Sequence, residues 1–157
     1  MSNNHGDIVI AAPAGYKWDE GTLTKITYVA EAGDVKYESL QKAIDAAKSK
    51  AVVTMLADTR ENVTISKALT LDLNGFTLNG STGERKAALK VDNATVTVMD
   101  SSANQTGTIK REDVEDPNVT GSNSYYVIDI QGGNGLLIFE GGNAVSYTHL
   151  TLPTNSR

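Results

Sequence analysis

The chain has 157 residues, of which 39% are hydrophobic and 21% are charged, and its formal net charge is −5. This length and composition fit one globular domain with enough residues to bury a core. The acidic balance argues against a nucleic-acid or anionic-membrane partner, because either needs clustered lysine and arginine. The absence of cysteine excludes disulfides and cysteine nucleophiles. No apolar run approaches the roughly 20 residues that span a bilayer.

The N-terminal region predicts extended segments rather than a core. Residues 1–24 are expected to be the end of a preceding module or a linker, with a short strand over Asp7–Ala12. They lack the basic and apolar regions of a signal peptide, so an export signal is expected upstream of them. The β-branched stretch Lys25–Ala32 predicts a strand, and Val35–Tyr37 is expected to return antiparallel to it as a short hairpin.

One helix is predicted near residues 39–49. Ser39 is a favourable N-cap because its hydroxyl accepts a backbone N–H bond. Apolar residues then recur at spacings of three and four, which makes one apolar stripe. The stripe consists of Leu40, Ala43, Ile44 and Ala47, and the side chains expected to point to water are those of Gln41, Lys42, Asp45 and Lys48.

After the helix, the pattern changes to short strands separated by turns. An apolar strand over 51–56 comes first, and three passes of strand and turn follow, with Asn and Gly at the corners. A polar, acidic loop over 110–124 separates the second pass from the third. The predicted strands are 63–65, 69–73 and 76–78 in the first pass, 87–91, 95–98 and 107–109 in the second, and 126–130 and 136–139 in the third.

The three passes align at a period of roughly 25 residues, which is typical of solenoids. Ile65 aligns with Val91 and then Ile130, while Leu73 aligns with Val98 and then Phe139. The last step is longer by about the length of the polar loop. A leucine-rich repeat would show a leucine and asparagine consensus that the chain lacks. The pattern therefore predicts a mostly β fold, a parallel β-helix of about three coils.

Alternate strand residues are expected to point into the coil. The predicted inward residues are Leu69, Leu71, Leu73, Val96, Val98 and Phe139, and the outward ones are Thr70, Asp72, Thr95 and Thr97. The helix is expected to lay its apolar stripe over the open first coil and to shield an edge that invites association. Because the third coil lacks a neighbour, we expect the chain alone to be marginally stable or to self-associate through this uncapped coil.

Four segments resemble a known family. They are 37–47 (YESLQKAIDAA), 53–58, 61–65 and 69–78 (LTLDLNGFTL). Together they look like the start of a pectin-lyase-like right-handed β-helix domain, of the variant found in repeat-bearing surface proteins of gut bacteria. The resemblance implies a right-handed parallel β-helix over 25–144 in a secreted or cell-surface protein. It implies little about activity, because most such domains have none assigned.

The end of the chain carries a second resemblance. Val145–Thr154 (VSYTHLTLPT) looks like a translated transposase sequencing adapter, a frequent contaminant of metagenome-derived sequences. We therefore expect residues 145–157 to be adapter-derived and the β-helix to be truncated in its third coil, where the repeat is not expected to continue past Asn143. The alternative is a genuine last strand over Ser146–Leu152.

Three carboxylates are the best candidates for glycoside hydrolysis, which needs two of them on one face. They are Asp72, Asp100 and Glu140. The alignment pairs Asp72 with Thr97 and then Ile138, so the three carboxylates fall at different strand positions. We interpret them as solvated or turn-capping groups, and no catalytic residue is predicted.

Histidine and metal chemistry are not expected. His5 and His149 have no evident partner for acid–base work. An acidic loop offers carboxylate oxygens for Ca²⁺ but lacks the spacing and glycine of a dedicated calcium loop, so a solvated loop is preferred and no cofactor is predicted. The candidate calcium ligands are Glu112, Asp113, Glu115 and Asp116.

Aromatic side chains are candidate glycan contacts, because their faces pack against the apolar faces of sugars. Trp18 and Tyr125 are the predicted contact residues. These features predict a non-enzymatic structural or adhesive segment of an exported bacterial surface protein, with glycans or host or bacterial surface proteins as partners. The alternative is an N-terminal fragment of a polysaccharide lyase or glycoside hydrolase whose catalytic coils lie elsewhere.

Overall fold

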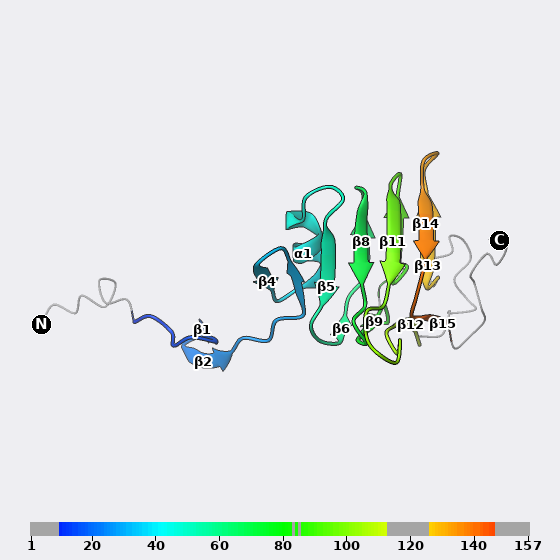
Figure 1. The fold of residues 1–157 in the computed structure, drawn as a ribbon. Helices are drawn as coiled ribbons and strands as arrows, with labels where there is room; N and C mark the ends of the chain where they lie inside the picture. The colour runs from blue at the N-terminus through cyan, green and yellow to red at the C-terminus, as the bar shows by residue number, and fades with distance from the viewer. Residues whose placement is uncertain (1–9, 83, 85, 113–125, 147–157) are drawn as a thin grey trace, which may run out of the picture.

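The structure, a computed structural model, describes residues 10–82, 84, 86–112 and 126–146 (Figure 1). Among these residues no helix is long and apolar enough to cross a membrane. The described elements are β1 (Tyr16–Asp19), β2 (Thr22–Lys25), β3 (Ala30–Ala32), β4 (Val35–Tyr37), α1 (Leu40–Ala46), β5 (Val52–Met55), β6 (Thr59–Arg60), β7 (Val63–Ile65), β8 (Leu69–Asp72), β9 (Thr77–Asn79), β10 (Leu89–Asp92), β11 (Thr95–Met99), β12 (Thr108–Arg111), β13 (Ile128–Gln131), β14 (Leu136–Phe139) and β15 (Asn143–Ser146).

Three sheets wrap around one axis. The first sheet contains β7, β10 and β13, the second contains β5, β8, β11 and β14 with β3 and β4 at its edge, and the third contains β6, β9, β12 and β15. The chain visits the three sheets in this order three times, and successive coils pair in parallel. The coil winds right-handed, as Figure 1 shows. The predicted mostly β fold, a parallel β-helix of about three coils, is confirmed.

Inward residues of successive coils lie beside one another and form the core. Val53, Leu71 and Val98 are in register on the second sheet, and all three are fully buried. In the first sheet, Ile65 pairs with Val91 as predicted. Because neighbouring strands lie roughly 4.8 Å apart, each apolar side chain contacts the one above and the one below it.

One predicted alignment is wrong by two residues. Val98 pairs with Leu71 and not with Leu73, so Asp72 lies beside Met99. Leu73 is also fully buried, although it follows the last residue of β8. Since both leucines face the core, the alternation of apolar residues could not distinguish the two registers.

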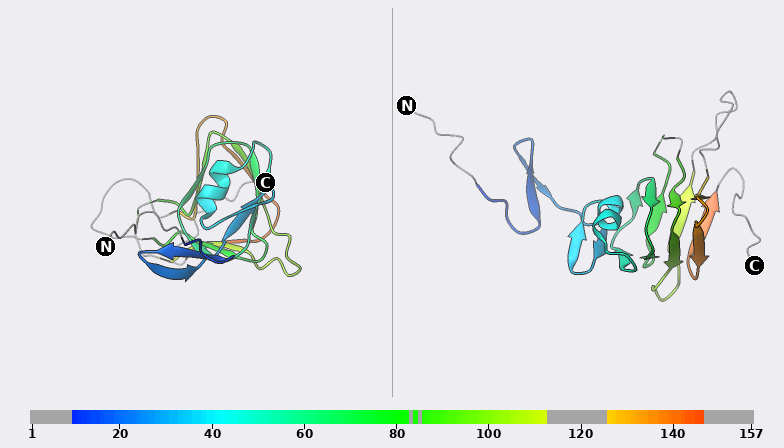
Figure 2. Two further views of the ribbon diagram at one scale, coloured as in Figure 1. Left: turned by 90° about the vertical axis from the view of Figure 1, so that its left-hand side faces the viewer. Right: turned by 90° about the horizontal axis from the view of Figure 1, so that it is seen from above.

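The helix α1 closes the N-terminal end of the stack, as predicted. It packs against β3, β4, β5 and β7, and the end-on view in Figure 2 shows it lying across the coil. Ser39 is the N-cap and accepts the Lys42 N–H at 3.4 Å. The helix ends at Ala46, a few residues earlier than predicted. Its buried side chains are those of the predicted stripe: Leu40, Ala43, Ile44 and the C-cap Ala47.

Gln41 was predicted to point to water but instead pairs with the edge of β7. Its side-chain carbonyl accepts the Thr64 N–H at 2.8 Å, and its side-chain amide donates to the Thr64 carbonyl at 3.0 Å. These two bonds replace those that a neighbouring strand would make. The first strand of the first sheet therefore has a satisfied edge, which blocks pairing with another chain.

Glu61 fastens the start of α1 to the coil. Its carboxylate accepts the Leu40 N–H at 2.8 Å, the Gln41 N–H at 3.2 Å and the Ser39 hydroxyl at 2.8 Å. Burial by itself raises the pKa of Glu61, but these bonds and one from Thr59 outweigh burial and hold the pKa below its ordinary value. The helix N-terminus, whose first N–H groups have no partner within the helix, is thus satisfied from the coil.

Replacing Glu61 with glutamine should lower the free energy of unfolding at pH 7 by about 1 kcal/mol, the usual effect of losing a helix cap. The folded-state pKa of Glu61 is lowered, so its ionised form contributes stability above roughly pH 4.3, which is lost as the pH falls through the folded-state value. Urea denaturation followed by circular dichroism should therefore show a smaller difference between wild type and Glu61→Gln at pH 3. The exposed Glu84→Gln is the control, and an equal Glu61→Gln effect at both pH values would contradict the argument.

Two antiparallel hairpins precede the coil. The predicted hairpin of β3 and β4 is present, and β3 also pairs antiparallel with β5, which extends the second sheet. A second hairpin, β1 with β2, was not predicted. Its turn places Glu20 and Gly21 at positive φ, which two-residue hairpin turns require. In the region predicted as a strand over Asp7–Ala12, residues 10–12 are not strand and the others lie outside the described residues.

The third coil continues past the predicted break at Asn143. Residues Asn143–Ser146 form β15, in register with β12. Ala144 is partly buried beside Ile109 and Val145 is exposed, so this strand alternates inward and outward residues as the earlier coils do. The adapter origin expected for residues 145–157 stays a prediction. Residues 147–157 lie outside the described residues.

Candidate functional site

A polar groove crosses the outward face of the third sheet, where β6, β9 and β12 lie side by side. Its volume is about 320 Å³, and it is open to solvent. Arg60 pairs with Asn79, and Asn79 pairs with Lys110. These three side chains therefore follow one another along the stack at the strand spacing of roughly 4.8 Å. The lining residues are Asp58, Thr59, Arg60, Thr77, Asn79 and Lys110.

The charges at the groove are balanced by short contacts. Lys110 Nζ lies 2.8 Å from a carboxylate oxygen of Glu112, and the Asn79 amide donates to the other oxygen at 3.0 Å. The bond from Lys110 and then that from Asn79 hold the pKa of Glu112 below its ordinary value. Arg60 donates from Nε to the Ser81 carbonyl, and its terminal guanidinium nitrogens make no hydrogen bond within the described part of the chain.

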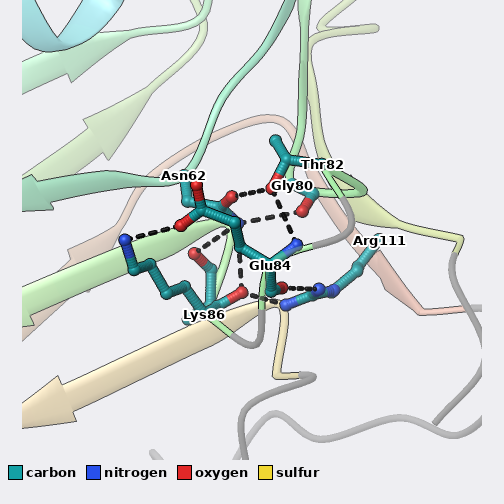
Figure 3. Close-up of polar contacts among 7 residues, drawn as sticks. Asn62, Gly80, Thr82, Glu84, Lys86 and Arg111 are labelled. Atoms are coloured by element: carbon teal, nitrogen blue, oxygen red, sulfur yellow. Dashed lines mark hydrogen bonds and ion pairs between the residues drawn. The ribbon is translucent and has the colours of Figure 1, made fainter. Parts of the chain in front are cut away.

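The loop between β9 and β10 borders this groove and is held from two coils (Figure 3). From one side, the Asn62 amide donates to three carbonyls of the loop at 2.9–3.1 Å. From the other, Arg111, which is 1% exposed, donates to the carbonyls of Lys86 and Glu84. The partly exposed Asn62 and the buried Arg111 thus fix the position of the loop. The three carbonyls bonded by Asn62 belong to Gly80, Lys86 and Ala87.

The groove offers hydrogen-bonding groups of every kind on a rigid surface. Hydroxyl, amide, guanidinium, ammonium and carboxylate groups lie within a few strand spacings of each other. Such a mixture suits a hydroxyl-rich ligand, because sugars donate and accept hydrogen bonds on all sides. Within the described residues, no group of three or more histidines or carboxylates could hold a metal ion.

The structure describes two of the predicted site residues, Glu112 and Trp18, and they lie in different parts of the fold. Glu112, a candidate calcium ligand, lies beside the groove and bonds Lys110 and Asn79. Trp18 lies in β1, which Figure 1 shows beyond the helix-capped end of the stack. The other candidates, Asp113, Glu115, Asp116 and Tyr125, lie outside the described residues.

Trp18 belongs to an exposed aromatic face of the β1–β2 hairpin. It pairs with Leu23, and Tyr16 lies two residues before it on the same face. The indole N–H donates to the Ile10 carbonyl at 2.8 Å, which orients the ring, and Trp18 remains 48% exposed. On the opposite face, Lys17 forms an ion pair with Glu38 at 2.5 Å. The aromatic face therefore points away from this contact with the rest of the chain.

Asp72 was predicted to point outward but is buried, with 6% of its surface exposed. One of its carboxylate oxygens accepts the N–H of Asn74 in its own coil and the N–H of Ser101 in the next coil, both at 2.9 Å. Its strand neighbour is Met99 and not Thr97. The carboxylate is buried because it caps two turns at once.

Asp100 makes the reciprocal connection. It accepts the N–H groups of Ser102 at 2.9 Å and Gly107 at 2.6 Å in its own coil, and that of Gly75 at 2.9 Å in the coil before. Burial raises the pKa of Asp100, but the bonds from Ser102, Gly107 and Gly75 prevail and lower it. The interpretation of Asp72 and Asp100 as turn-capping groups is confirmed, whereas Glu140 is exposed.

The groove itself was missed by sequence reasoning. A signal existed, because the predicted strands 76–78 and 107–109 end at equivalent positions, which places Asn79 beside Lys110. The strand β6 has only two residues, Thr59 and Arg60, and no apolar alternation to reveal it. Because β6 was not predicted, Arg60 could not be placed in the row beside Asn79 and Lys110.

No protein-family model, no curated protein and no solved structure matches the chain.

Proposed function

We propose that the chain is a non-enzymatic structural segment of an exported bacterial surface protein, and that its outward face contacts glycans. The structural role is supported mainly by the two buried carboxylates, which bond the backbone and face no open site. Asp72 and Asp100 both bond backbone N–H groups across two coils, so they serve to join coils. The exported setting is supported by the family resemblance of residues 37–78.

Two surfaces support the glycan contact. The groove along Arg60, Asn79 and Lys110 repeats at the strand spacing, so an extended polysaccharide can lie along the stack and meet similar groups at each coil. The hairpin presents Trp18 and Tyr16 as exposed aromatic faces. Protein interaction surfaces favour such rigid aromatic side chains because ordering them costs little conformational entropy.

Affinity electrophoresis tests this proposal. The full chain should be retarded in gels containing an acidic polysaccharide such as polygalacturonate or a neutral one such as xylan. Arg60→Ala should weaken binding about fivefold, since one hydrogen bond contributes roughly 1 kcal/mol. Trp18→Ala should weaken it by a similar factor.

The matched control for Arg60→Ala is Lys36→Ala, which removes one positive charge from an exposed position on β4, away from the groove. It should leave binding unchanged. No retardation in either gel would contradict glycan contact. Release of shortened or unsaturated sugar products during incubation would contradict the non-enzymatic role and would favour the lyase or hydrolase alternative.

A further inference from the structure

The sequence contains three asparagine residues that are each followed by glycine, and the structure places them in different surroundings. Such a pair can cyclise, because the glycine nitrogen attacks the side-chain Cγ of the asparagine and no glycine side chain hinders the attack. The reaction requires a glycine N–H that is released from other bonds and an asparagine side chain that is free to turn toward it. The three pairs begin at Asn74, Asn79 and Asn134.

The pair at Asn74 is held by bonds to other coils. The Gly75 N–H donates to the carboxylate of Asp100 at 2.9 Å. The side-chain amide of Asn74 donates to the Met55 carbonyl at 3.0 Å, which fixes the position of its Cγ. Cyclisation at this pair therefore requires two inter-coil bonds to break first.

The pair at Asn79 is held in the same way. Gly80 is buried, and its N–H donates to the Lys110 carbonyl at 2.9 Å. The side-chain amide of Asn79 donates to the carboxylate of Glu112 at 3.0 Å. Both reacting groups of this pair are thus engaged by the second coil.

The pair at Asn134 lies in an exposed turn between β13 and β14. Asn134 is exposed, and its side chain makes no hydrogen bond with any residue that the structure describes. The Gly135 N–H donates to the Gly132 carbonyl at 3.2 Å, within the same turn. This bond is at the long end of the usual range and closes only a four-residue turn, so it opens without breaking a bond between coils.

We propose that Asn134 is a site of spontaneous backbone modification, at which the chain cyclises and reopens as isoaspartate or aspartate. The Gly135 nitrogen bonds Cγ of Asn134, its proton passes to the side-chain amide nitrogen, and ammonia leaves. Water then opens the cyclic imide. Attack of water at the backbone carbonyl carbon leaves the chain running through Cγ, which is isoaspartate, and attack at Cγ gives aspartate. One ammonia is lost and one water is gained.

Isoaspartate at this position should loosen the third coil from the second. The Asn134 N–H donates to the side-chain carbonyl of Asn93 at 3.1 Å, and the Leu136 N–H donates to the Ala94 carbonyl at 2.9 Å. Isoaspartate adds one backbone atom between these two donors, whereas their acceptors stay on adjacent residues. The two bonds then no longer fit together. Because the turn lies outside the groove, this modification is independent of glycan contact.

Peptide mass spectrometry of the aged chain tests the assignment. The folded chain is kept in mildly alkaline buffer and sampled over time, and each sample is digested with pepsin in acid, where cyclisation is slow. Asn134 should convert roughly tenfold faster than Asn74 and Asn79, which react only after local opening. In urea the three residues should convert at similar rates. Conversion of Asn134 no faster than that of the other two in the folded chain would overturn the proposal.

Asn134→Gln is the matched variant for the effect on the coil, because glutamine would have to form a larger ring and cyclises slowly. Amide hydrogens of β13 and β14 should exchange about fivefold faster in the aged wild type than in aged Asn134→Gln, which corresponds to the loss of about one hydrogen bond. Asn104→Gln, at an exposed asparagine that is not followed by glycine, should age as the wild type does. Equal exchange in aged wild type and aged Asn134→Gln would contradict the loosening of the third coil.

Discussion

Replacing Leu71 with alanine should lower the free energy of unfolding by about 3 to 4 kcal/mol, within the range measured for buried leucines. Leu71 is fully buried at the centre of the second sheet, in register with Val53 on one side and Val98 on the other. The substitution leaves a cavity that β-helix packing cannot close, because both neighbouring side chains are held by strand pairing. Urea denaturation followed by circular dichroism gives the free energy.

Thr70→Ala is the matched control for this change. Thr70 is the preceding residue of the same strand, points outward and is partly exposed. Its substitution should alter the free energy of unfolding by about 0.5 kcal/mol or less, as is usual on surfaces. Equal effects of the two substitutions would show that Leu71 does not face the core and that the register is wrong.

Replacing Asp100 with alanine should cost about 2 to 3 kcal/mol at pH 7, since it leaves three backbone N–H groups without their acceptor. Those groups belong to Gly75, Ser102 and Gly107. The pKa of Asp100 is lowered in the folded state, so its ionised form contributes stability above roughly pH 3.9, which is lost as the pH falls through the folded-state value. Denaturation at pH 7 and pH 2.5 should therefore give a large and a small difference, respectively.

Asp92→Ala is the control for Asp100→Ala. The side chain of Asp92 is 44% exposed and lies 3.9 Å from Lys90, an arrangement that contributes little to stability. We expect a change of about 0.5 kcal/mol or less at pH 7. A loss for Asp100→Ala as small as that for Asp92→Ala would show that the turns of the two coils do not depend on this carboxylate.

The sequence predicted the elements that depend on local periodicity. The apolar stripe of α1, its cap at Ser39 and the alternation of Val63–Ile65 or Leu89–Asp92 follow from side-chain spacing alone, and the structure confirms them. The choice between Leu71 and Leu73 as the partner of Val98 did not follow. This register depends on the position at which the chain turns after β8. Asp72 sets that position, because its buried carboxylate caps the turn at Asn74 and the turn at Ser101.

The groove could not be predicted for a different reason. Its row joins Arg60, Asn79 and Lys110, which come from three coils and share no local pattern. Gln41 and Glu61 were missed for the same cause, because each bonds an element about twenty residues away in the chain. Side-chain contacts that replace backbone pairing leave no periodic signal in a single sequence.

The bonds of Asp72 and Asp100 make the two ends of the coil stack differ in how firmly they are held. Each carboxylate joins the first complete coil to the second, but Gly141 stands near Asp100 in the third coil and carries no side chain to continue the series. Among the described residues, the third coil is therefore joined to the second by strand pairing and by the amide side chains of Asn93 and Asn143, without a buried carboxylate. The first coil is held by carboxylates and by α1. Amide hydrogens should exchange with solvent first at β13 to β15 and last at β7 and β8, because local unfolding begins at the third coil and reaches the first coil last.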